Sequence, residues 1–89
     1  MSRVHLFVSG FVQGVGFRTK TARLAQSLAL SGWIKNLPDG RVEAVFEGEK
    51  EKLDQIMDWV RYGPSAARVG NIEVAWEKEE GLQGFEVKD

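Results

Sequence analysis

Arg18 and the two glycines that precede it, Gly14 and Gly16, are the residues of this 89-residue chain best suited to chemistry. A guanidinium can donate two parallel hydrogen bonds to a phosphate, and the glycines leave the main chain open to an anion. The apolar segment 4–8 predicts a strand before them, and helical spacing follows them. Unpaired N–H groups at the start of a helix bind anions. The pattern therefore predicts a phosphate cradle between a strand and a helix.

The common nucleotide-binding motifs do not fit this cradle. A Walker loop needs a lysine directly after its second glycine, and neither Gly14 nor Gly16 is followed by one. A dinucleotide fingerprint needs a third glycine where Thr19 stands. On glycine spacing alone, a tight turn beside a solvated Arg18 is an equally good interpretation.

A second motif decides between these interpretations, because together the two resemble the acylphosphatase family. The first matches its Gly-x-Val-Gln-Gly-Val-x-Phe-Arg pattern with Gly10, Val12, Gln13, Gly14, Val15, Phe17 and Arg18. The second matches its Gly-aromatic-x-x-Asn-x-x-x-Gly-x-Val pattern with Gly32, Trp33, Asn36, Gly40 and Val42. The segment 63–69 is similar to the family's linker, and the resemblance covers about residues 4–85.

The resemblance implies hydrolysis of acyl phosphates to a carboxylate and inorganic phosphate, by in-line attack of water and without a metal, a cofactor or a covalent intermediate. It implies that the Arg18 guanidinium binds the phosphate and that Asn36 holds the attacking water. The phosphate-binding main-chain N–H groups would be those of Gln13, Gly14, Val15, Gly16, Phe17 and Arg18. Read without the family, Asn36 is an ordinary residue of the turn at 38–40.

Hydrophobic periodicity predicts the elements that position these residues. Val4, Leu6 and Val8 alternate with polar or aromatic neighbours in a first strand, and a helix is expected over 17–30 with Gly32 as its stop. Segments 33–37 and 41–47 flank a turn and predict a hairpin. A second helix is predicted from the spacing of Leu53, Ile56, Met57 and Val60. A fourth strand is predicted from the alternation of Ile72, Val74 and Trp76, and a short fifth strand from Phe85 and Val87.

This order predicts an α+β fold over a single domain, residues 1–89. It is the ferredoxin-like βαββαβ sandwich, an antiparallel sheet with two helices on one face and a short extra C-terminal strand. The chain departs from better-known family members because segment 85–89 lacks their basic and aromatic C-terminus. If that terminus orients the arginine, Lys88 or the terminal carboxylate must do so here.

Composition narrows the functional classes. The net charge is −1 and there is no cysteine, which excludes a thiolate nucleophile and disulfides. The N-terminal residues do not form the apolar run of a signal peptide or membrane span. We therefore expect a cytoplasmic monomer that acts on a small acyl phosphate, with no cofactor, metal, nucleic-acid or membrane partner.

Two other functions remain open at this stage. One is a non-catalytic module that binds a phosphoanion or carbamoyl phosphate, although its expected mark, damage to Arg18 or Asn36, is absent. The other is RNA binding on the uncovered sheet face, where Phe7 and Val45 would form a thin platform beside acidic residues. His5, the one histidine, is expected to be a plain sheet residue away from any carboxylate cluster. The three tryptophans, Trp33, Trp59 and Trp76, are expected to pack.

Overall fold

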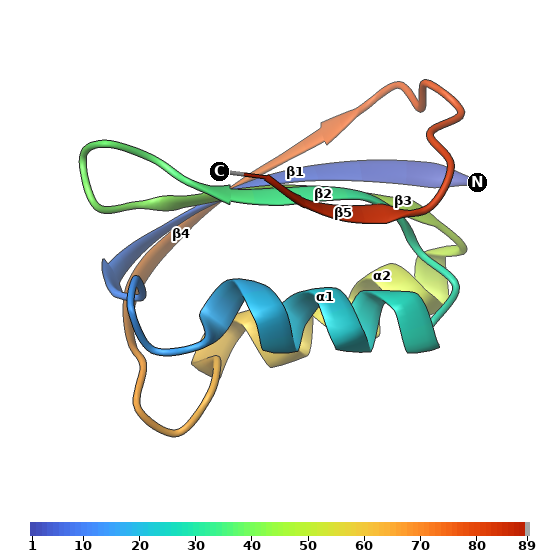
Figure 1. The fold of residues 1–89 in the computed structure, drawn as a ribbon. Coiled ribbons are helices and arrows are strands. Elements are labelled where there is room, and N and C mark those ends of the chain that lie inside the picture. Colours follow the sequence, from blue (N-terminus) through green and yellow to red (C-terminus); the bar gives the residue numbers. More distant parts are fainter. Residues whose placement is uncertain (89) are drawn as a thin grey trace.

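The computed structural model describes residues 1–88 as a sheet with two helices packed against one of its faces (Figure 1). The strands are β1 (Ser2–Phe11), β2 (Ser31–Asn36), β3 (Val42–Gly48), β4 (Arg68–Glu77) and β5 (Phe85–Lys88). The helices are α1 (Phe17–Ser27) and α2 (Lys50–Tyr62). The predicted ferredoxin-like order is confirmed, including the short C-terminal strand.

The strands lie in the order β4-β1-β3-β2-β5. The first four form antiparallel pairs, as predicted, but β5 runs parallel to β2, so the sheet is mixed and the prediction of an antiparallel sheet is wrong for this strand. Residues 78–84 connect the end of β4 to β5, and β5 runs in the opposite direction to β4. β2 also runs opposite to β4, so β5 pairs in parallel because it joins the edge formed by β2.

The core lies between the sheet and the helices. Val4, Leu6 and Val8 of β1 are buried there, which confirms the predicted alternation of that strand. Leu53, Ile56 and Val60 of α2 are also buried, as their spacing predicts. In contrast, Trp76, which was expected to pack, is 49% exposed at the sheet edge formed by β4 and lies outside the buried core.

Helix α1 ends at Ser27, three residues before the predicted end at Leu30. Ala29 adopts a left-handed conformation with φ 58°, and Leu30 N–H donates to the carbonyl of Ala25 at 2.9 Å. This hydrogen-bonded cap closes the helix without a glycine. Gly32 instead lies in β2, where an added Cβ would collide with the carbonyl of Val45.

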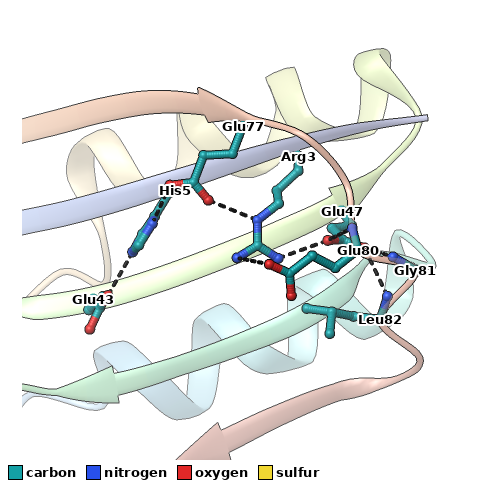
Figure 2. A network of polar contacts seen from close by, with 8 residues as sticks. All are labelled: Arg3, His5, Glu43, Glu47, Glu77, Glu80, Gly81 and Leu82. Carbon is teal, nitrogen blue, oxygen red and sulfur yellow. Dashed lines mark hydrogen bonds and ion pairs between the residues drawn. The ribbon is translucent and has the colours of Figure 1, made fainter.

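The sheet face that the helices leave uncovered carries a network of charged side chains (Figure 2). Glu47 is 3% exposed and accepts four hydrogen bonds, from Arg3 Nη1 at 2.8 Å and from the N–H groups of Glu80, Gly81 and Leu82 at 2.9, 3.1 and 2.9 Å. Burial by itself would raise the pKa of Glu47, but the Glu80 N–H and the Arg3 guanidinium hold it below its ordinary value. Glu47 thus anchors segment 78–84.

His5 lies in the same network, between two carboxylates. Its Nε2 is 2.6 Å from Glu43 and its Nδ1 is 2.8 Å from Glu77 (Figure 2). The expectation that His5 lies away from carboxylates is therefore wrong. The reason is that β3 and β4 pair with β1 on either side, which brings together residues far apart in the sequence. Val45, which the RNA-binding alternative would need on an exposed platform, is fully buried.

Neither helix within residues 1–88 has the length and apolarity needed to cross a membrane.

We predict that Glu47→Gln lowers the free energy of unfolding by about 2 kcal/mol at pH 7, because it removes a buried charge that several donors bind. Since the pKa of Glu47 is lower in the folded than in the unfolded chain, its stabilisation is complete above roughly pH 5 and is lost as the pH falls through the carboxyl range. Urea unfolding at a series of pH values measures the effect, with the exposed Glu79→Gln as control. Equal stability of Glu47→Gln and wild type at pH 7 would contradict this role.

Candidate active site

Residues 12–16, here called the cradle loop, connect β1 to α1. Gly14 and Gly16 have φ of 75° and 80°, a left-handed conformation that side-chain-bearing residues rarely adopt. The first N–H group to bond along α1 is that of Lys20, which donates to the carbonyl of Gly16 at 3.1 Å. Within residues 1–88, the N–H groups from Phe17 to Thr19 have no acceptor, and the first turn contains no acidic residue. This end of α1 can therefore bind an anion.

Phe17 fixes the end of the cradle loop against the core. Its side chain is buried, and an added Cβ at Gly63 would lie only 2.6 Å from its ring. Gly63, which follows α2, thus lets the aromatic ring approach the main chain closely. Because Phe17 points inward, the next residue, Arg18, is free to extend along the surface of the cavity.

Arg18 contacts the C-terminal strand. Its Nη1 donates to the main-chain carbonyl of Lys88 at 3.0 Å, so Lys88 contacts the arginine through its main chain. The Lys88 ammonium lies over the ring of Trp33 instead. The terminal carboxylate lies outside the described residues. Among residues 1–88, Arg18 takes part in no ion pair, so its charge is available to a ligand.

Asn36 ends β2, and its Oδ1 is buried without a hydrogen-bond donor among the described residues. The turn that follows does not use this amide. The turn is closed by Leu37 N–H to Arg41 O at 2.8 Å and by Asp39, whose carboxylate accepts from Arg41 N–H at 3.1 Å. That hydrogen bond from the Arg41 main chain is the largest cause of the lowered pKa of Asp39. The simple turn role considered for Asn36 thus belongs to Asp39.

Arg18 and Asn36 line one cavity of about 210 Å³ at the end of the molecule where α1 begins. Its lining is Val12, Gly14, Gly16, Phe17, Arg18, Thr19 and Asn36. Five of the predicted site residues are thus brought together. Gln13 and Val15 are not among them, because the Gln13 side chain binds the β2–β3 hairpin and Val15 packs against the core. Thr19 was missed, although its place beside Arg18 in the first helical turn is a usable signal.

A second hollow, of about 370 Å³, lies between α2 and β4. It is lined by Leu6, Met57, Arg61, Ile72, Val74 and Trp76. Of the described residues that line this hollow, Arg61 is the only charged one and the others are apolar or aromatic, so the hollow is not the candidate active site. Among the described residues, no three His, Cys, Asp or Glu side chains lie close enough to hold a metal ion.

Comparison with known proteins agrees with this geometry. The sequence profile of the acylphosphatase family matches residues 4–87. This chain belongs to the acylphosphatase family. An acylphosphatase of Trichormus variabilis is 56% identical over 97% of this chain and 85% of that protein, and one of Thermococcus kodakarensis is 52% identical over 96% and 93%. The crystal structure of the Bacillus subtilis acylphosphatase superposes on this chain over the full length of both proteins, with 36% sequence identity and a TM-score of 0.96.

We predict that Gly16→Ala destabilises the fold by roughly 1–2 kcal/mol, the cost of a left-handed conformation for alanine. Relief of that strain would turn the neighbouring N–H groups away from the cavity, so inorganic phosphate should also bind more weakly. The matched control is Gly81→Ala, because Gly81 has φ 76° and open space around it but lies outside the cavity. Urea unfolding and phosphate titration separate the two effects. Equal loss of phosphate affinity in both variants would contradict an anion site at Gly16.

Proposed function

We propose that this chain hydrolyses the carboxyl-phosphate bond of small acyl phosphates, with Arg18 and the start of α1 binding the phosphoryl group and Asn36 positioning the attacking water. Hydrolysis of acyl phosphates is the reaction of the family to which the chain belongs. The observation that carries the assignment of residues is the buried, unbonded Oδ1 of Asn36, which lines the same cavity as the Arg18 side chain.

The reaction needs little acid–base chemistry from the protein. Water oxygen forms a bond to phosphorus while the bond from phosphorus to the acyl oxygen breaks, and the leaving group departs as a stable carboxylate. Negative charge spreads over the equatorial phosphoryl oxygens. Arg18 and the N–H groups of Gly16, Phe17 and Thr19 stabilise this charge, because they are fixed before the reaction begins.

The attacking water requires an acceptor on the side opposite the leaving group. A buried amide oxygen without a donor costs about 1–3 kcal/mol when it stays unpaired, and a water that donates to Asn36 Oδ1 removes this cost. Such a water is held close to the phosphorus, in line with the bond that breaks. No side-chain base among residues 1–88 lines the cavity, so the proposed acceptor of the water's proton is a phosphoryl oxygen of the substrate.

The Arg18 guanidinium supplies the positive charge that a metal ion supplies in many phosphoryl-transfer enzymes, and the proposed reaction is metal-independent. We also propose that the chain acts as a monomer in the cytoplasm, with no nucleic-acid partner. Family membership favours hydrolysis over a non-catalytic module for a phosphoanion or carbamoyl phosphate. The acidic network on the uncovered sheet face argues against RNA binding, because it would repel a phosphate backbone.

We predict that Arg18→Gln lowers kcat for an aryl acyl phosphate by about a hundredfold or more and weakens inhibition by inorganic phosphate, since both depend on the guanidinium. Hydrolysis by the wild type should be unchanged by a strong chelator. Arg23→Gln is the matched control, because Arg23 is an exposed arginine of the same helix. Full activity of Arg18→Gln, or loss of wild-type activity with chelator, would contradict the respective part of the proposal.

We predict a different pattern for Asn36→Ala: a fall in kcat of about a hundredfold, with inhibition by inorganic phosphate unchanged. The reason is that the amide binds the water and not the phosphoryl group. Asn71→Ala, at an exposed asparagine of β4, serves as control. Steady-state kinetics with phosphate as inhibitor gives both values. If Asn36→Ala weakens phosphate binding as strongly as it lowers kcat, the assignment of Asn36 to water is wrong.

A further inference from the structure

The Gln13 side chain connects the two halves of the proposed active site. Its Nε2 donates to the main-chain carbonyls of Leu37 and Arg41, at 2.9 Å in both cases. Leu37 directly follows Asn36, and Leu37 and Arg41 are the pair whose hydrogen bond closes the β2–β3 hairpin. Among residues 1–88, no other side-chain hydrogen bond joins the cradle loop to this hairpin.

Both N–H groups of the Gln13 side-chain amide are used in these contacts. A primary amide has two N–H groups, and Nε2 places one on each carbonyl. Both carbonyls belong to a hydrogen-bonded turn, so they are rigid acceptors. Gln13 is half-buried, which shields the two bonds from water. A side chain that ends on two fixed acceptors holds its own main chain at one distance from the hairpin.

That distance matters because the two halves of the site come from different parts of the chain. In the proposed function, Gly14, Gly16 and Arg18 lie beside the phosphoryl group and Asn36 binds the water, and all four residues line one cavity. The glycines make the cradle loop easy to deform. A displacement of about 1 Å between reacting groups can lower a rate by roughly a hundredfold.

We infer that Gln13 is a positioning residue that sets the distance between the phosphate cradle and the water held by Asn36. The inference rests on the proposed function. It adds a side-chain role to a motif whose main chain is proposed to bind phosphate, because the Gln13 side chain binds the hairpin and Gln13 is not among the residues that line the cavity. A purely structural role would have another consequence. If the bond only held the cradle loop in shape, its loss would weaken phosphate binding as well as turnover.

The test replaces Gln13 with Met, which keeps the length of the side chain and removes both donors. For the full chain, we expect kcat for an aryl acyl phosphate to fall by about 10- to 100-fold, while inhibition by inorganic phosphate changes less than about twofold. Gln55→Met, at an exposed glutamine of α2, is the matched control. Urea unfolding shows that each variant is folded under assay conditions. If Gln13→Met is not folded, Gln13→Leu, which is uncharged and also lacks the N–H donors, takes its place with the same expectation.

A double variant shows whether Gln13 acts through Asn36. In the Asn36→Ala background, we expect Gln13→Met to lower kcat by less than about threefold, because the water that it positions is already lost. An equal loss in both backgrounds, or a parallel loss of phosphate binding, would overturn the inference. The inference would also be overturned if Gln13→Met kept full activity while Asn36→Ala lost it, and that result would leave the proposed function intact. An active Asn36→Ala would instead contradict the proposed function itself.

Discussion

The main-chain N–H groups at the start of α1 have no acceptor among residues 1–88, and the site is organised around this unsatisfied helix end. A helix end without partners is unfavourable unless a ligand or water binds it. Two features maintain it. Gly16 takes a left-handed conformation with no side chain to cap the N–H groups, and Phe17 fixes the first turn in the core. An anion bound at this position would complete the hydrogen bonding that the fold leaves open.

Four acidic side chains lie together on one face of the sheet. Glu43, Glu47, Glu77 and Glu80 gather on the uncovered face around Arg3 and His5 (Figure 2). The guanidinium of Arg3, followed by His5, lowers the pKa of Glu77. Among residues 1–88, no carboxylate lines the cavity beside Arg18. These four carboxylates thus gather around Arg3 and His5 and not at the cavity where phosphate binding is proposed.

Local patterns were sufficient to predict most of the fold. Alternation identified β1 and helical spacing identified α2, because each of these signals lies within a few neighbouring residues. Arg18 and Asn36 were proposed as site residues from the resemblance to a family, and the structure places both at one cavity. What local patterns missed depends on tertiary pairing. The carboxylates beside His5 come from β3 and β4, and the acceptors of Gln13 come from the hairpin. The early end of α1 at Ser27 depends on the left-handed Ala29 that follows it, and helix-stop rules based on glycine do not anticipate a left-handed alanine.

The buried ion pair and the site are connected through the C-terminal strand. Glu47 binds Arg3 and the N–H groups at 80–82, which fixes the segment that leads into β5. The stacked rings of Phe46 and Phe85 hold the start of β5, and its parallel pairing with β2 carries the chain to the end of the molecule where α1 begins (Figure 1). There the Lys88 carbonyl accepts from Arg18. Because this acceptor belongs to the main chain, the strand's position matters more than the identity of its last side chains. A C-terminus without the usual basic and aromatic residues can therefore still orient the arginine, provided that Glu47 holds the segment before it.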